Sequence, residues 1–218
     1  MYMKKELTLI LAVVICPFIT GSAMAAGTAD MSVGGTVITG SCTPTLSAST
    51  VDYGTIDVSR LTSTNEKEGN RLGFRDITLN VTCDSPMKVA WGATDNRAET
   101  AAWLNSDIEI SNGYGLGYFF GLGDTPEGKH IGSYSITLTE PGSTVDGEPA
   151  YLAQRHGASG TWVHLANGNR AAVYERESNH YSFTVVSPGT LEPMAATTVS
   201  YALSISLQVD LMSNLNLT

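Results

Sequence analysis

The sequence predicts an all-β fold, an antiparallel β-sandwich held by one disulfide bond. Apolar and polar residues alternate in many short segments, and these segments are separated by Gly, Pro, Asn and Asp. No segment of comparable length carries the apolar stripe of an amphipathic helix. The absence of a strong linker or internal repeat further predicts a single domain.

The composition excludes several classes of protein. Hydrophobic residues make up 42% of the chain and charged residues 15%, whereas about 25% is usual for charged residues in globular domains. Disordered chains have more charge and fewer aromatic residues than this one. The formal net charge of −9 argues against a nucleic-acid partner, because a phosphate backbone attracts basic surfaces.

Residues 1–25 have the features of a secretory signal peptide. Two lysines precede an apolar run at residues 7–19, and small residues then form an A-x-A pattern that ends at Ala25. We expect cleavage between Ala25 and Ala26, and export of residues 26–218 to the periplasm, the cell surface or a fimbrium. The alternative is a retained anchor helix. No later apolar stretch is long enough for a transmembrane segment.

Two cysteines remain after the signal peptide, Cys42 and Cys83. Export delivers the chain to an oxidising compartment, so an isolated pair favours a disulfide. The bond would close a loop of about 40 residues and stabilise the fold by roughly 4 kcal/mol. Two unpaired thiols are the alternative.

Strand-like alternation recurs along the whole chain. The predicted strands are residues 31–37, 77–83, 88–91, 108–110, 114–122, 133–139, 161–165, 181–186 and 199–211.

The last of these segments has the strongest pattern. Its seven apolar residues follow a strict period of two, which predicts one buried face and one wet or lightly covered face, the latter including Ser204 and Ser206. At about 3.3 Å per residue the strand would be roughly 40 Å long. The apolar residues are Val199, Tyr201, Leu203, Ile205, Leu207, Val209 and Leu211.

No motif predicts catalysis, a metal site or a cofactor. Residues 123–129 fit G-x-x-x-x-G-K, but His130 stands where a phosphate-binding loop has Ser or Thr. The four histidines are never at metal-ligand spacing. Six aromatic residues could stack on sugar rings, although aromatic residues in a sandwich more often fill the core. They are Trp91, Trp103, Trp162, Tyr118, Phe119 and Phe120.

The order of short motifs resembles the subunits of chaperone–usher fimbriae. It resembles more closely a poorly characterised fimbrial-like family of enterobacterial exported proteins. The motifs are Val33-x-Gly-Thr-Val37, Cys42-Thr-Pro-Thr-Leu46, Asp52-Tyr-Gly-Thr-Ile56, Thr82-Cys-Asp84, Ala93-Thr-Asp-Asn-Arg97, Tyr114-Gly-Leu-Gly117 and Ile131-Gly-Ser-Tyr134.

This resemblance implies an immunoglobulin-like, pilin-like sandwich that lacks its last strand. In such subunits a periplasmic chaperone fills the resulting apolar groove, and the N-terminal extension of another subunit then replaces the chaperone. The resemblance therefore makes residues 26–40 a candidate donor segment, and makes 199–211 a candidate assembly strand bordering the groove. The candidate donor residues are Met31, Val33, Gly35 and Val37.

The sequence departs from the fimbrial pattern near its C-terminal end. Fimbrial subunits usually carry a glycine about fourteen residues from the end and a penultimate tyrosine. This chain has Ile205 and Leu217 at those positions.

Two hypotheses about function follow. In the first, the protein is a non-catalytic, exported fimbrial-like subunit with a structural or adhesive role, whose partners are a periplasmic chaperone and other subunits. In the second, it is a soluble periplasmic or surface binding module with a complete sandwich, for example one that binds a glycan. A secreted hydrolase ranks third because its catalytic signatures are missing.

Overall fold

A computed structural model describes residues 40–64, 69–102, 118–165, 170–173, 175–176 and 179–215. The chain divides into two units, Met1–Ile38 and Thr39–Thr218, and all described residues belong to the second. The predicted signal peptide, its cleavage point at Ala25 and Ala26, and the candidate donor strand lie outside the described residues. The donor residues concerned are Met31, Val33, Gly35 and Val37.

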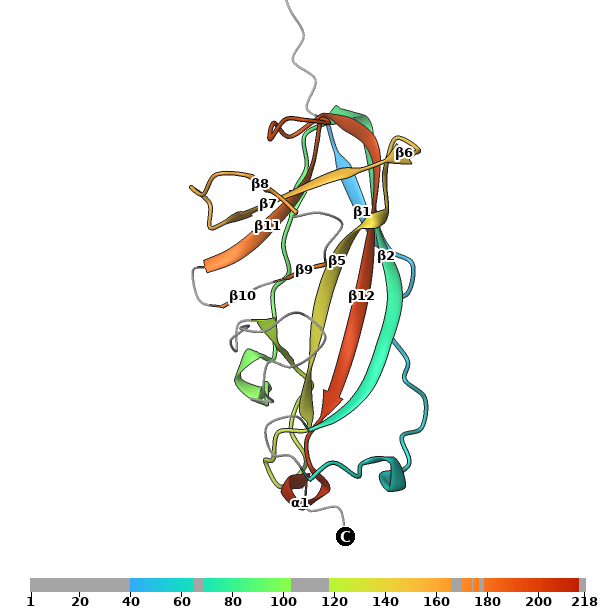
Figure 1. The fold of residues 1–218 in the computed structure, drawn as a ribbon, viewed down its shortest axis with the longest axis vertical. Coiled ribbons are helices and arrows are strands. Elements are labelled where there is room, and N and C mark those ends of the chain that lie inside the picture. Colours follow the sequence, from blue (N-terminus) through green and yellow to red (C-terminus); the bar gives the residue numbers. More distant parts are fainter. Residues whose placement is uncertain are drawn as a thin grey trace, which may run out of the picture. The chain divides into compact units, whose positions relative to one another are not determined.

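The described residues form two antiparallel sheets (Figure 1). The first sheet has the order β1 (Cys42–Leu46), β2 (Asn70–Met87), β12 (Ala196–Val209), β5 (Gly132–Val145) and β4 (Phe120–Gly121), and β6 (Glu148–Pro149) and β9 (Arg170–Ala172) also pair with β5. The second sheet has the order β10 (Glu175–Arg176), β11 (Asn179–Val186), β7 (Tyr151–His156) and β8 (Val163–His164), and β3 (Ala90–Trp91) pairs with β11. The described helices are short: η1 (Val58–Arg60), η2 (Ala98–Thr100) and α1 (Met212–Leu215).

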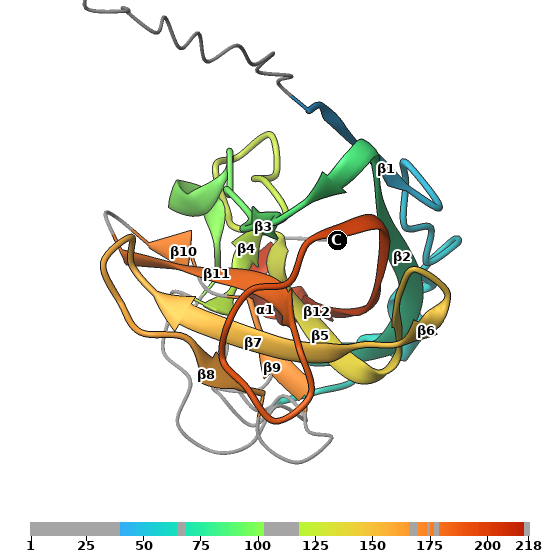
Figure 2. The same cartoon turned by 90° about the horizontal axis from the view of Figure 1, so that it is seen from above.

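This arrangement confirms the predicted all-β antiparallel sandwich. Seen from above, β1 and β2 lie on one side, the strands of the second sheet lie on the other, and β3 runs between them (Figure 2). The expected strand at residues 108–110 lies outside the described residues. Five strands were not predicted: β1, β7 and the short strands β6, β9 and β10.

The core lies where the two sheets face each other. Leu138 of the first sheet and Leu152, Phe183 and Val185 of the second are fully buried in one cluster. Trp91 packs on Phe183, with ring centroids 5.2 Å apart. Each such buried side chain stabilises the fold by about 1.5–3 kcal/mol. Trp91 belongs to the second sheet through β3, and its ring also lies 5.6 Å from the ring of Tyr201 in β12, so this second contact links the two sheets.

The predicted disulfide is confirmed. Cys42 and Cys83 are joined and are register partners in the β1–β2 pair, at a sequence separation of 41. The bond therefore ties β1, a short strand at the end of its sheet, to the long strand β2.

The long C-terminal strand is confirmed, but its environment differs from the prediction in two respects. First, β12 ends at Val209, so Leu211 lies beyond the strand, although its side chain is buried. Second, the prediction of a wet or lightly covered polar face is wrong for the C-terminal half of β12. The side chains of Ser204, Ser206 and Gln208 are only 6%, 5% and 1% exposed.

The position of β12 in its sheet explains this burial. Ser204 is the register partner of both Asp76 in β2 and Thr137 in β5. Its hydroxyl donates to the Asp76 carboxylate, and the Thr137 hydroxyl donates to the Ser204 carbonyl at 3.1 Å. A small side chain flanked by partners on both sides is shielded from water, whichever face it occupies.

Candidate binding groove

An apolar groove of about 590 Å³ opens beside β1, between the inner face of the first sheet and the segment that follows β3. None of the described residues that line it is charged. Its principal apolar side chains are Leu46, Ile77, Leu79, Trp91, Leu203 and Ile205.

The strand register brings these side chains to one face. Leu46 is opposite Leu79 across β1 and β2, and Leu203 is opposite Ile77 across β12 and β2. Residues directly opposite in a sheet point to the same side. Leu203 is 5% exposed whereas Leu46 is 52% exposed, so Leu203 belongs to the floor of the groove and Leu46 to its rim.

The rim strand β1 is an edge strand. Among the described residues it pairs with β2 alone. The N–H of Ser47 donates to the Thr78 carbonyl at 2.9 Å and the N–H of Asp84 donates to the Ser41 carbonyl at 3.0 Å. Backbone direction alternates along a strand, so the backbone groups of Cys42, Pro44 and Leu46 point to the open edge.

Pro44 limits what this open edge can bind. Proline has no N–H group and is tolerated in sheets mainly at edges, where it also discourages indiscriminate pairing. The edge therefore offers the carbonyls of all three residues but the N–H groups of Cys42 and Leu46 alone. An incoming strand would have to match this pattern of donors and acceptors.

The opposite wall of the groove comes from Trp91, Gly92 and Ala93. A Cβ atom on Gly92 would lie 2.9 Å from the carbonyl oxygen of Tyr181. Glycine therefore allows this segment to lie close to β11. Deeper in the core, the rings of Trp91 and Tyr201 are 5.6 Å apart, and burial raises the pKa of Tyr201.

The candidate assembly strand contributes side chains to the groove but no open edge. Leu203 and Ile205 line it, whereas Val199 and Tyr201 lie in the main core. Leu207 is buried and Val209 belongs to a separate apolar cluster. Because β12 is paired with β2 and β5, its backbone cannot accept another strand. The open edge is β1, which sequence analysis missed.

The other candidate residues lie away from the groove. Within the described ranges, no group of three or more His, Cys, Asp or Glu could hold a metal ion. His130 contacts the exposed Asp124 carboxylate at 2.7 Å. Phe120 is buried and stacks on Tyr134 at 5.2 Å, as expected of a core residue. Trp103 lies outside the described residues.

In the part of the chain that the structure describes, no helix is both long and apolar enough to span a membrane.

Comparison with known proteins identifies relatives but no activity. A family described as "Protein of unknown function (DUF1120)" matches residues 31–135. Protein GltF of Escherichia coli (strain K12) is 30% identical over 230 residues, covering 96% of this chain and 91% of that protein. The uncharacterized protein YhcF of the same strain is 28% identical over 207 residues, covering 88% and 85%. No solved structure was found to match. The predicted membership of a poorly characterised enterobacterial family is confirmed.

Proposed function

The chain belongs to the DUF1120 family of proteins of unknown function, and from its groove we propose that it is a non-catalytic, exported fimbrial-like subunit that assembles by strand complementation. The observation that carries this proposal is the apolar groove beside the open edge of β1. A strand entering there would gain backbone hydrogen bonds from β1 and bury alternate side chains in the groove.

The groove suits an extended segment with apolar residues at every second position. Its lining is uncharged, its rim residue Leu46 is half-exposed, and Ile77, Leu79, Leu203 and Ile205 contribute apolar side chains to it. An uncovered apolar face beside a free edge favours aggregation. We therefore propose that a periplasmic chaperone occupies the groove before assembly, and that a second subunit occupies it afterwards.

The donor that we propose is the segment 26–40 of another copy or of a related subunit. Met31, Val33 and Val37 alternate with small or polar residues there, as a strand requires when one of its faces enters an apolar groove. Gly35 would leave a gap in the apolar face at its position.

A peptide with the sequence of residues 26–40 tests this proposal. At a concentration about 100 times its Kd, a ligand that binds the folded form alone stabilises it by about 2.7 kcal/mol. The peptide should therefore raise the melting temperature of the mature protein in a concentration-dependent way. A peptide with aspartate in place of Val33 and Val37 should have no effect.

Two variants of the protein locate the effect. Leu46→Asp places a charge on the rim of the groove and should abolish the response to the peptide. Leu191→Asp is the matched control, because Leu191 is an exposed leucine (43%) that does not line the groove. A monomer that melts cooperatively and is indifferent to the peptide would instead favour a complete binding module.

A further inference from the structure

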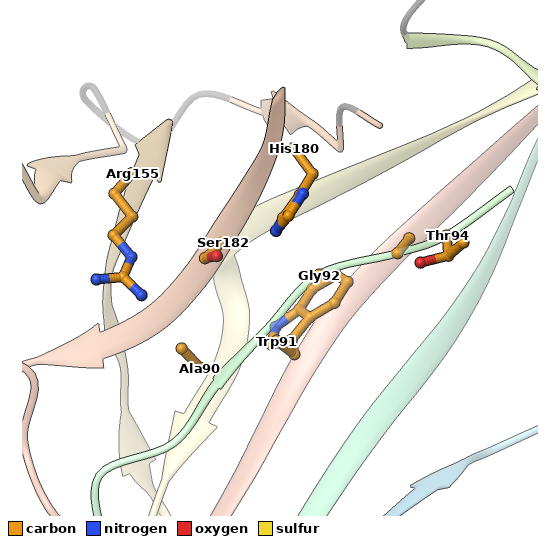
Figure 3. Close-up of a pocket in the computed structure, with 8 residues that line it drawn as sticks. Ala90, Trp91, Gly92, Thr94, Arg155, His180 and Ser182 are labelled. Atoms are coloured by element: carbon orange, nitrogen blue, oxygen red, sulfur yellow. The ribbon is translucent and has the colours of Figure 1, made fainter. Parts of the chain in front are cut away.

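A second, polar pocket of about 320 Å³ lies where the β3 segment meets β11. Figure 3 shows Arg155 on β7 and His180 and Ser182 on β11, with Trp91, Gly92 and Thr94 running alongside. Trp91 is shared with the apolar groove, but the polar side chains of this pocket are not.

The register of the second sheet brings its polar side chains together. Arg155 and Ser182 are register partners across β7 and β11. His180 precedes Ser182 by two positions, so its side chain leaves the strand on the same face. This face is opposite to the one on which Phe183 enters the core. The three side chains therefore converge by strand geometry.

The guanidinium of Arg155 is held in place by an aromatic ring. Its central carbon lies 4.6 Å from the ring centroid of Trp162, a distance at which a cation is attracted to the ring face. The planar guanidinium is thereby oriented before any ligand arrives. Preorganisation of this kind lowers the entropy cost of binding.

The pocket is rich in donors and has no acid. The whole chain carries 21 acidic and 12 basic residues, yet none of the residues lining this pocket is an aspartate or a glutamate. Arg155 has no salt-bridge partner among the described residues. In the same region, Arg155 Nε and Trp91 Nε1 are buried without a hydrogen-bond acceptor. These N–H groups add to the positive electrostatic potential of the pocket.

Unmatched positive charge and converging donors are the features of an anion site. We propose that this pocket binds the carboxylate of a small ligand, either an acidic sugar or a free organic acid. The terminal guanidinium nitrogens present a fork that matches the two oxygens of a carboxylate. Ser182 and His180 supply further polar contacts. The volume is at the lower end of the usual range for ligand sites, about 300–1,000 Å³, so one sugar ring or a short diacid fits.

Three small molecules test this inference by calorimetric titration of the mature protein. Glucuronate carries a carboxylate on a sugar ring, glucose has the ring alone, and glutarate has carboxylates without a ring. We expect binding of at least one carboxylate and no binding of glucose. Tighter binding of glucuronate identifies a sugar ligand, tighter binding of glutarate identifies an organic acid, and equal binding means that the carboxylate alone is recognised.

Substitutions then assign the binding to this pocket. Arg155→Gln should weaken binding by at least about tenfold, because it removes a charged, bidentate partner. Ser182→Ala should weaken binding to a smaller extent. It also tests the pocket independently if the Arg155→Gln protein does not fold. Arg60→Gln is the matched control, since Arg60 is an exposed arginine on η1 that does not line the pocket.

Three results would overturn the proposal. They are failure of both carboxylates to bind at millimolar concentration, equal binding of glucose and glucuronate, and unchanged affinity in folded Arg155→Gln and Ser182→Ala proteins. None of these results bears on strand complementation, because the peptide and Leu46 experiments address a different surface.

Discussion

Removal of the disulfide tests both the stability of the domain and the anchoring of its edge strand. The double substitution Cys42→Ala and Cys83→Ala breaks a link across 41 positions of sequence. Loop-closure entropy for that separation corresponds to about 4 kcal/mol at 25 °C. In a domain of this size, each kcal/mol shifts the melting temperature by about 2–4 °C, so a decrease of roughly 8–16 °C is expected.

Urea unfolding at pH 7 measures the change in the free energy of unfolding. The wild-type protein with dithiothreitol should approach the stability of the double variant, and the variant itself should not respond to the reductant. A loss smaller than about 1 kcal/mol would refute the entropic reasoning.

Hydrogen exchange tests the local consequence of the same substitution. Among the described strands β1 pairs with β2 alone, through five register pairs. The β1 amides that face β2, and the amide of the adjoining Ser47, should therefore exchange faster than those in the β7–β11 pair. Uniform acceleration throughout the domain would show that β1 is not a separately mobile element.

Two further substitutions test single sites. Ser204→Asp should destabilise the protein by several kcal/mol in urea titrations, because it buries a carboxylate beside Asp76. Ser204→Ala should lower the free energy of unfolding by only about 1 kcal/mol. Equal stabilities of the two variants would contradict the burial of this face of β12. Hydrogen bonds from the Thr197 side chain, and then from the Thr198 backbone, lower the pKa of Asp146 below its ordinary value of 3.8. The stability that this carboxylate contributes is present above pH 3.8 and is lost as the pH falls through its lower folded-state pKa. Asp146→Asn removes the charge but tolerates the positive φ of 47° at this position. It should lower the melting temperature more at neutral pH than in acid, and a difference that does not change with pH would be inconsistent with this origin.

The features predicted well from sequence depend on local pattern. The strict alternation at residues 199–209 identifies a strand and its core-facing side chains, because a period of two is a property of the backbone. The disulfide follows from the presence of two cysteines outside the predicted signal peptide. Neither prediction requires knowledge of which strands are neighbours.

The features missed from sequence depend on sheet order. Ser204 and Gln208 are buried because β12 lies between β2 and β5, and nothing in the polar side chains themselves indicates that position. The edge strand β1 has five residues, of which Pro44 is not a strand former, so it lacks a strong pattern. Its proline within a Thr-rich segment after Cys42 was the available signal for an edge strand.

The candidate sites are still less visible in the sequence. Arg155 and Ser182 are neighbours because β7 pairs with β11. Trp91 lines both the apolar groove and the polar pocket because β3 pairs with β11. These contacts join segments far apart in the chain. A count of aromatic residues identified Trp91 and Trp162 as sugar-stacking candidates, but it did not identify the arginine that lies against Trp162.

The central place of β12 also governs the order in which the domain folds. The strand joins β2 to β5, and its contact between Ser204 and Asp76 spans 128 positions. During synthesis from the N-terminus, β2 and β5 emerge long before the strand that separates them, so neither has its native neighbour on that side. Folding of this sheet therefore waits for a late segment, which is the condition under which long-range β-topologies fold slowly and aggregate. A factor that protects newly synthesised chains would act in this interval, when the edges of β2 and β5 that pair with β12 are still without their partner.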